Sequence, residues 1–314
     1  MALRIEDYAV IGDTQSAALV GRDGSIDWLC LPRFDSSACF AALLGDARNG
    51  RWRLAPEGVK RVERRYRDDT LVLETDFHTE DGAIRLVDCM PPRGEAPDIV
   101  RLVQGLEGRV EVEMELILRF DYGHVVPWVR RYGETQLVVA GPDAVRLDTP
   151  VKTRGEDFTT RATFAVEKGD EVPFVLTWYP SHVDEPAPVH AATAVADTDA
   201  WWRAWIGACN RSDPLTRRSL LTLKALTYAP TGGIVAAATT SLPEKIGGVR
   251  NWDYRYCWVR DAALTLNALV VGGFVAEAGA WRDWLLRAVA GDPRDMQIMY
   301  GCAGERRLTE LELD

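Results

Sequence analysis

No stretch of the 314-residue sequence approaches the ~20 consecutive apolar residues that a membrane-spanning helix requires. The first residues, MALRIEDYAVIGD, carry acidic side chains where a secretory signal needs a basic patch followed by an apolar core. These two absences predict a cytoplasmic protein that is not inserted in a membrane and whose thiols are reduced.

Closely spaced cysteines are also missing. The sequence has no C-x-x-C pair, and none of its four histidines lies at a metal-ligand spacing from a cysteine. The histidines are His78, His124, His182 and His190, and the six cysteines are Cys30, Cys39, Cys89, Cys209, Cys257 and Cys302. We therefore expect no zinc site, no other bound metal and no cofactor.

Basic residues are too few to balance the acidic ones. The chain has 37 Lys and Arg against 47 Asp and Glu, which gives a formal charge of -10 and a pI near 5.1. Such a surface repels phosphate backbones and anionic membranes, so neither nucleic acid nor a membrane is an expected partner. A neutral or small substrate fits better, and the hydrophobic content of 47% can fill the cores of two domains.

The first 185 residues have the patterns of antiparallel strands. In GRVEVEMELILRF (108–120), apolar residues alternate with mostly charged ones, which is typical of a strand with one buried and one wet face. Turn-forming pairs such as Asp81-Gly82, Glu107-Gly108 and Gly169-Asp170 separate the candidate strands. The other candidates are TLVLETDF, AIRLVDCM, IVRLVQGL, TQLVVAG, AVRLD, TRATFAVE and PFVLTWY. This pattern predicts a β-sandwich domain over residues 1–185.

Composition changes after this region. The Pro/Ala-rich DEPAPVHAA predicts a linker, and the helix expected over 193–209 places Trp201, Trp202, Trp205 and Ile206 on one face, so we assign 186–212 to a linker and connecting helix. Residues 213–314 are expected to be helical, with a Gly-rich loop at 229–248. The signals are Asp213 and Pro214 at a helix start, Gly272-Gly273 at a second helix end, and Gly291 and Pro293 after a third.

The stretch NWDYRYCWVRDAAL (251–264) combines aromatic rings with an Arg-Asp pair. Its four rings, Trp252, Tyr254, Tyr256 and Trp258, fall at period two, so in an extended segment they share one face. Such a row can be core, or it can be a platform for the apolar faces of a sugar, with Arg260 donating to hydroxyls and Asp261 accepting from them. Asp261 is equally explained as an acidic residue in a first helical turn. The residues alone leave these two interpretations open.

Three ordered motifs carry a resemblance to a known family. They are YAVIGDTQSAALVGRDGSIDWLCLPRFDSSACFAALLG, then ATTSLPE with GGVRNWDYRYCWVRDAALTLNAL, then QIMYGCAGERRLTELEL. The chain resembles the bacterial glucoamylase and trehalase-like members of glycoside hydrolase family 15 from Ile5 to its last residue. The resemblance implies a β-sandwich followed by an (α/α)6 barrel, and an inverting α-glucosidase acting on an α-glucan oligosaccharide or trehalose from the non-reducing end.

The resemblance also implies roles for single residues. The family pattern Tyr-x-x-x-Trp-x-Arg-Asp falls on Tyr254, Trp258, Arg260 and Asp261, which are expected to hold the non-reducing-end glucose. Asn251, Trp252 and Tyr256 are expected to be structural support. The segment GRDGSIDWLCLPRFDSS is family-like as well, but it suggests no chemical role, so we interpret it as structural.

The two catalytic glutamates of the family, a general acid and a general base, are expected beyond Asp314, so no catalytic residue is expected in this chain. About a hundred residues after Asp213 hold only three or four helices of an incomplete barrel, and the 314-residue chain is expected to be inactive. Glu305, Glu310 and Glu312 are expected to be solvated. Exposed apolar side chains are expected at Leu264, Leu266, Leu269, Trp281, Trp284 and Leu285.

Two other functions remain possible on this reasoning. One is a non-catalytic carbohydrate-binding or scaffolding protein, which would bind a glucoside without turnover. The other is a glycoside phosphorylase, which would require phosphate and release a sugar phosphate; the Arg-Asp motif favours family 15 over it.

Overall fold

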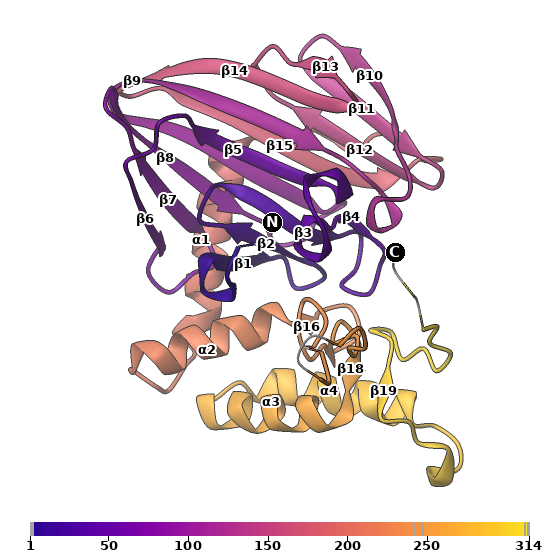
Figure 1. Cartoon of the computed structure of the whole chain (residues 1–314). Helices are drawn as coiled ribbons and strands as arrows, with labels where there is room; N and C mark the ends of the chain where they lie inside the picture. The colour runs from indigo at the N-terminus through magenta and orange to yellow at the C-terminus, as the bar shows by residue number, and fades with distance from the viewer. Residues whose placement is uncertain (1–2, 242, 246–247, 311, 313–314) are drawn as a thin grey trace. The chain divides into compact units, whose positions relative to one another are not determined.

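The computed structural model describes residues 3–241, 243–245, 248–310 and 312 (Figure 1). It contains two compact units. Unit 1 comprises Met1–Asp13, Ala18–Pro32 and Ser37–Trp202, and unit 2 comprises Thr14–Ala17, Arg33–Ser36 and Arg203–Asp314. In the predicted Gly-rich loop, residues 242, 246 and 247 lie outside the described part of the chain.

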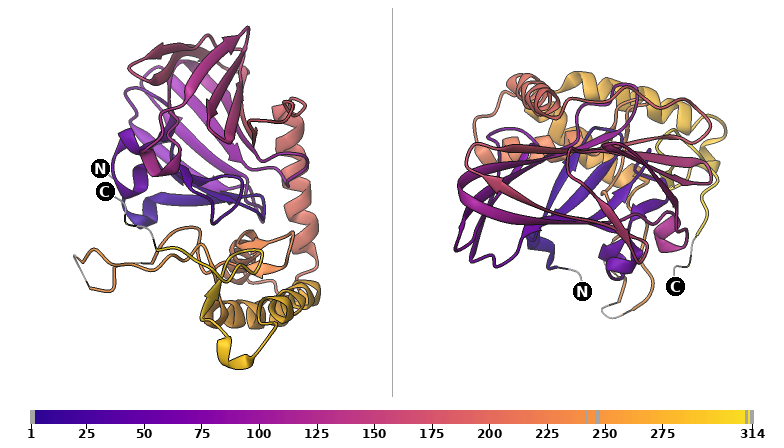
Figure 2. Two further views of the ribbon diagram at one scale, coloured as in Figure 1. Left: turned by 90° about the vertical axis from the view of Figure 1, so that its right-hand side faces the viewer. Right: turned by 90° about the horizontal axis from the view of Figure 1, so that it is seen from above.

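Unit 1 is an antiparallel sheet of 15 described strands folded into two layers (Figure 2). The strands are β1 (Tyr8–Gly12), β2 (Ala17–Gly21), β3 (Ser25–Cys30), β4 (Ala38–Phe40), β5 (Arg51–Pro56), β6 (Arg61–Tyr66), β7 (Leu73–His78), β8 (Gly82–Cys89), β9 (Asp98–Ile117), β10 (Trp128–Tyr132), β11 (Thr135–Ala140), β12 (Asp143–Asp148), β13 (Arg154–Glu156), β14 (Thr159–Glu167) and β15 (Glu171–Pro180). Short 3-10 helices occur at Ile5–Asp7, Ala42–Leu44, Ala47–Asn49 and Asp121–Gly123. The predicted antiparallel β region is confirmed.

The 20-residue strand β9 joins the two layers. Its first half pairs with β8 and β15, and its second half pairs with β5 and β14. The turn predicted at Glu107-Gly108 is wrong, because these residues form an irregularity inside the continuous strand: Ala83 pairs with Glu107 and Ile84 with Gly105, so Leu106 is skipped. Gly108 has a φ of 66°, and a Cβ there would collide with the carbonyl oxygen of Asp81.

The apolar core of unit 1 lies between the layers and contains one buried ion pair. Arg101 and Asp88 have fully buried side chains, and Arg101 Nε donates to Asp88 Oδ1 over 2.8 Å. Arg101 also donates to the carbonyl oxygens of Trp52 and Gly24, at 2.6 and 2.7 Å. The large buried side chains of this core include Trp52, Phe40, Phe77, Phe174 and Ile26. The guanidinium therefore links β9 to β5 and to the turn before β3 from inside the core.

Helix α1 (Ala191–Gly207) follows the Pro/Ala-rich segment and contains the boundary between the units. Its first turns pack Ala191, Ala194 and Val195 against a second apolar cluster that includes Val100 and Val175. Trp202, one of the residues predicted to form the apolar face of this helix, is buried.

Unit 2 holds three further helices, α2 (Pro214–Ala225), α3 (Val259–Gly272) and α4 (Val275–Ala288). It also has the two-residue strands β16 (Thr227–Tyr228), β17 (Gly233–Ile234), β18 (Cys257–Trp258) and β19 (Met299–Tyr300), and a 3-10 turn at Pro293–Asp295. The predicted start of α2 is confirmed, because the Asp213 carboxylate accepts from Thr216 N over 2.8 Å. The predicted end of α3 is confirmed by Gly273 in the left-handed conformation.

Six apolar side chains of the helices are expected from the sequence to be exposed, and for three of them this expectation is wrong. Leu269, Trp281 and Trp284 are buried within unit 2, because α3 packs on α4 and Trp284 lies edge-on to Tyr300 and donates to Cys302 O over 3.0 Å. The apolar side chains exposed on these two helices are Leu264, Val270, Val271, Val275 and Leu286. In the described part of the chain, no helix combines the length and the apolar character needed to cross a membrane.

Candidate functional site

The Arg-Asp pair lies in the first turn of α3. Arg260 donates to Asp261 Oδ2 from Nε and Nη2, at 3.1 and 2.9 Å. These hydrogen bonds to the Asp261 carboxylate, together with its negative charge, raise the pKa of Arg260, so the guanidinium stays protonated. The carboxylate at a helix N-terminus is favoured by the helix dipole. The Arg260 and Asp261 side chains are 66% and 30% exposed, so the pair can meet a ligand from solvent.

The aromatic side chains converge on Trp258. The ring of Tyr254 lies edge-on to it at 5.5 Å, the ring of Trp252 does the same at 5.4 Å, and the Arg260 guanidinium lies 5.6 Å from its centroid. Trp258 Nε1 donates to Asp253 O over 2.9 Å, which fixes the orientation of the indole. The four predicted site residues Tyr254, Trp258, Arg260 and Asp261 are thus brought together around one ring.

The extended conformation considered for the aromatic row is wrong. Tyr254 and Arg255 form a turn, in which Arg255 N donates to the Asp253 carboxylate over 2.9 Å, and the strand begins only at Cys257. Burial increases along the segment and does not follow its two faces. Arg255 is 4% exposed and Cys257 is fully buried, but Trp258 on the aromatic face is also only 6% exposed. The most exposed ring is that of Trp252, at 42%.

Arg255 is a supporting residue that the sequence pattern did not reveal. Its Nε lies 3.0 Å from Asp253 Oδ1 and its Nη2 lies 2.7 Å from Asp253 Oδ2. Its Nη1 donates to the carbonyl oxygen of Ser36 over 2.8 Å. This two-pronged pair holds the turn that positions Tyr254, and it joins the turn to an N-terminal segment of the same unit.

That N-terminal segment, Arg33–Ser36, is the RFDS part of the family-like motif. Arg33 pairs with Asp35 over 2.8 Å and with Glu305 over 2.9 Å, and Asp35 Oδ2 accepts from Cys302 N over 3.1 Å. Burial disfavours the charge on Arg33, but its hydrogen bonds to Asp35 and Glu305 outweigh this and raise its pKa. The structural interpretation of this motif is now specific: it binds the segment around Cys302 and the turn before Trp258.

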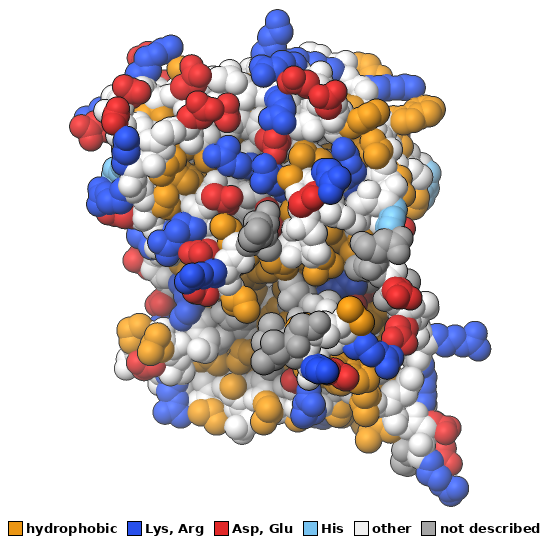
Figure 3. Space-filling model, viewed as in Figure 1, with side chains coloured by type: hydrophobic (Ala, Val, Ile, Leu, Met, Phe, Trp, Pro, Cys, Tyr) orange, Lys and Arg blue, Asp and Glu red, His pale blue; other side chains and the backbone are white. Residues whose placement is uncertain are grey.

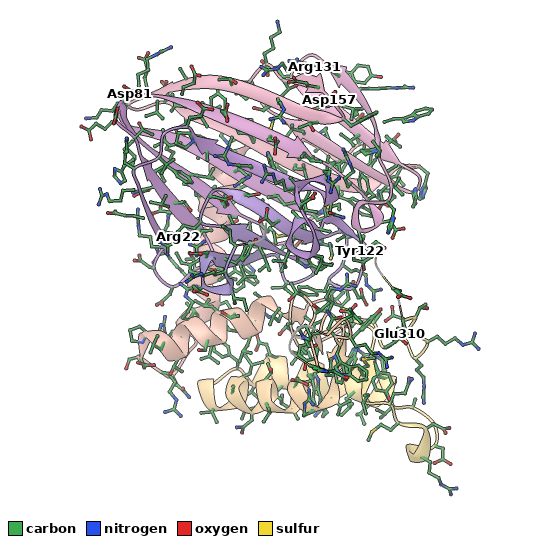
Figure 4. All side chains as sticks on the ribbon, in the orientation of Figure 1. Arg22, Asp81, Tyr122, Arg131, Asp157 and Glu310 are labelled. Carbon is green, nitrogen blue, oxygen red and sulfur yellow. The ribbon has the colours of Figure 1, made fainter. Side chains whose placement is uncertain are left out.

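The glutamates near the end of the sequence have different surroundings. Glu305 is not simply solvated as expected, since it pairs with Arg33 and accepts from Ala303 N over 3.0 Å. Glu310, which Figure 4 labels, is 84% exposed and pairs with Arg250. Glu312 is exposed. None of the three faces Asp261 through a hydrogen bond or ion pair between described residues.

Residues 3–241, 243–245, 248–310 and 312 contain no group of three or more His, Cys, Asp or Glu side chains that could hold a metal ion. The site therefore offers stacking surfaces, a guanidinium donor and a carboxylate acceptor, which suit a polyhydroxylated ligand.

Comparison with known proteins accounts for both units. Residues 1–185 match the model of the trehalase-like N-terminal family, and residues 211–314 match the model of glycosyl hydrolases family 15. The chain belongs to glycosyl hydrolase family 15. The trehalase-like N-terminal part covers most of unit 1 together with residues 14–17 and 33–36 of unit 2. The family 15 part contains Tyr254, Trp258, Arg260 and Asp261.

Curated relatives of this family 15 chain are trehalases. It is 36% identical to a trehalase of Mycobacterium tuberculosis over 344 residues, which cover 98% of this chain and 50% of the relative. It is 31% identical to trehalase 1 of Sulfolobus acidocaldarius over 315 residues, covering 99% and 54%. The chain spans about half the length of the curated relatives it matches.

A solved structure supports the fold of the family 15 chain. The structure of a bacterial glucoamylase in complex with acarbose matches with a TM-score of 0.69 at 13% identity, covering 98% of this chain and 53% of that chain. At this identity the likeness shows the fold alone, an antiparallel β domain followed by the first helices of an (α/α)6 barrel.

Proposed function

We propose that this family 15 protein functions as an inverting α-glucosidase in which the chain supplies the pocket for the non-reducing-end glucose. The observation that supports this is the convergence of Tyr254, Arg260 and Asp261 on the indole of Trp258. We propose the same domain limits as the sequence predicts: a β-sandwich over 1–185, a connecting segment over 186–212 and the family 15 domain from 213.

The proposed contacts follow from the chemistry of a pyranose. Its C–H face packs on the ring of Tyr254 or Trp252, which the buried indole of Trp258 holds in place, while its hydroxyls need both donors and acceptors. Both hydrogen bonds from Arg260 end on Oδ2 of Asp261. Oδ1 can therefore accept from a sugar hydroxyl, and the exposed guanidinium can donate to another. Hydrogen bonds to charged groups are worth about 1.5–3 kcal/mol each, so the pair can hold a glucose without a metal.

Hydrolysis with inversion requires two more carboxyl groups. A general acid protonates the leaving oxygen while a general base activates water on the opposite face of the sugar. We propose that both glutamates lie beyond Asp314 and that the chain of 314 residues binds without cleaving.

Trehalose is the substrate that we favour over an α-glucan. The curated relatives are all named trehalases, including those of Mycobacterium tuberculosis and Sulfolobus acidocaldarius. Trehalose joins two glucose units through their anomeric carbons, so a pocket for one non-reducing-end glucose accepts either half.

The test compares two ion pairs in unit 2, each formed by an arginine and the aspartate that follows it in the sequence. Arg260→Ala and Asp261→Ala remove the proposed sugar contacts, whereas Arg282→Ala removes a pair on α4 in which Arg282 also bonds its neighbour Asp283, at 2.8 Å. Calorimetric titration of this chain with trehalose should show binding that either site variant weakens about tenfold or more, and that Arg282→Ala leaves unchanged.

In a form that carries the whole family 15 domain, the same two site variants should lower kcat/KM for trehalose by about a hundredfold or more. Folded variants that bind and hydrolyse at the parent level would remove these residues from the pocket. Cleavage that requires phosphate and releases a sugar phosphate would instead assign the protein to the phosphorylases.

A further inference from the structure

A cleft in unit 1 has no role in the proposed glucose site. It opens between the two layers of the sheet, with the end of β9 and the β13–β14 hairpin on one side and β10 and β11 on the other. Its volume is about 470 Å³, within the range of about 300–1,000 Å³ that is typical of small-ligand sites. Figure 3 shows hydrophobic side chains at the surface where β10 and β13 lie. The lining includes Leu118, Val129, Gln136, Val138, Phe158 and Thr160.

The floor of the cleft carries a buried amide with an unsatisfied atom. Gln136 is 7% exposed, and its Nε2 donates to Thr160 Oγ1 over 2.9 Å across the two layers. Its Oε1 has no hydrogen-bond partner among the described residues. A buried polar atom without a partner costs about 1–3 kcal/mol, so a ligand group that bonded to Oε1 would recover this cost. A hydroxyl group does so whichever way the amide is turned, because it both donates and accepts.

The mouth of the cleft presents an exposed ring on a strained turn. Phe158 is 80% exposed, and both it and Asp157 adopt positive φ values, 56° and 47°. Arg119 holds the turn by donating from Nη1 to the carbonyl oxygens of Leu118 and Phe158, at 2.7 and 3.2 Å. Figure 4 labels Asp157 on this turn. Asp157 and Phe158 are the two loop residues of the β13–β14 hairpin, whose tight turn requires positive φ at both positions and so places the Phe158 side chain in solvent.

The charges around the cleft are of both signs. Its lining contains Glu156 and Asp157 and no Lys or Arg. Arginines lie next to this lining, since Arg154 Nε and Arg161 Nε are each 3.8 Å from Glu156 Oε2 and Arg119 bonds to the Phe158 carbonyl oxygen. This mixture favours a neutral ligand, with an apolar face for Phe158 and a hydroxyl for Gln136.

We propose that this cleft is a second carbohydrate site, which binds a neutral pyranose saccharide with its C–H face on Phe158 and a hydroxyl on Gln136. The inference goes beyond the proposed function, because the cleft lies in unit 1 and contains none of the residues around Trp258. A wholly apolar ligand would leave Gln136 unsatisfied.

The test uses the 314-residue chain carrying Asp261→Ala, so that binding at the other site is weakened, and it follows the signals of unit 1 alone. Titration with maltotriose and with trehalose, followed by NMR, should show saturable binding to unit 1 in the millimolar range. Phe158→Ala and Gln136→Leu should each weaken this binding about tenfold. Trp128→Ala is the matched control, because Trp128 is also an exposed aromatic residue, at 77%, but does not line the cleft.

Three outcomes would overturn the proposal. The first is no saccharide binding to unit 1, and the second is binding that neither substitution weakens. The third is self-association of the chain that Phe158→Ala abolishes, which would mean that a second copy covers the ring. Phe158→Ala keeps the test informative if Gln136→Leu lowers the melting temperature, since its exposed side chain is not needed for folding.

Discussion

Arg255 Nη1 donates a hydrogen bond to the carbonyl oxygen of Ser36 over 2.8 Å, although 219 residues separate them in the sequence. The same guanidinium also bonds to Asp253, so one buried side chain connects the turn before Trp258 to the N-terminal segment Arg33–Ser36. The geometry around Trp258 therefore depends on residues that are far apart in the sequence.

Arg255→Met should be strongly destabilising. It leaves the Asp253 carboxylate without its partner in a mostly buried place, which typically costs about 3 kcal/mol or more. Urea unfolding should show this loss in unit 2. Arg250→Ala breaks an exposed pair with Glu310 and serves as the control, with an expected cost below about 1 kcal/mol. Equal effects of the two substitutions would contradict the supporting role of Arg255.

Gly108→Ala should destabilise unit 1 more than Gly169→Ala does. Both glycines have positive φ, at 66° and 92°, but a Cβ at 108 meets the Asp81 carbonyl whereas a Cβ at 169 meets nothing within 4 Å. We expect a cost of about 1–2 kcal/mol at 169 from backbone strain alone. The cost at 108 should be larger by roughly 1–3 kcal/mol, because the bulge must also move. Thermal melting of both variants measures the difference.

Thiol labelling should distinguish Cys209 from the other five cysteines. Cys209 is partly exposed, while the rest are buried. Burial raises the pKa of Cys89 to about 12 and that of Cys39 above its usual range, and a hydrogen bond with Cys257 raises that of Cys302. A disulfide reagent at neutral pH should label one thiol quickly in the native chain and six after denaturation. Rapid labelling of several thiols in the native chain would contradict this burial.

Glu277 should contribute to the acid sensitivity of unit 2. Burial raises its pKa, but hydrogen bonds from Trp205 Nε1 at 2.6 Å and Lys224 Nζ at 3.2 Å outweigh this, so the net shift is downward. A carboxylate whose pKa is lower in the folded state stabilises the fold above its unfolded pKa of about 4.3 and ceases to do so as the pH falls through the folded value.

The stability advantage of the parent over Glu277→Gln should therefore be present near neutral pH and vanish under acidic conditions. Unfolding by urea across this range measures it. Asp283→Asn is the control on the same helix, with a side chain that is 54% exposed. A difference between parent and Glu277→Gln that is independent of pH would show that the carboxylate charge is not involved.

Local patterns account for most of what the sequence predicts correctly. Alternation of side chains over 108–120, the cap at Asp213 and the left-handed Gly273 all depend on near neighbours, so they can be recognised without the fold. The same local reasoning misread Glu107-Gly108 as a turn, because the pairing of β9 with both layers is a long-range effect that favours a bulge instead.

For a similar reason, the sequence predicts some residues of the candidate site and not others. The Arg-Asp pair and its aromatic neighbours are adjacent in sequence, and the family motif points to them. The burial of Arg255 could not be predicted, since its partner Ser36 is far away in the chain. Trp284 was expected to be exposed from the number of helices alone, whereas its burial comes from Tyr300 and Cys302 beyond α4.

The discontinuity of unit 2 has a consequence for the order in which the protein is made. Residues 14–17 and 33–36 belong to unit 2 but leave the ribosome well before the rest of it. They bond to segments that lie between and after the helices: Thr14 O accepts from Ala229 N, Ser36 O from Arg255 and the Asp35 carboxylate from Cys302 N. Although unit 1 is mostly N-terminal and can begin to fold early, these two segments form their bonds only after residue 302 has been made. If another molecule bound these two segments during synthesis, the strands of unit 1 would still form, but the segment around Trp258 would lack its partners and would not fold.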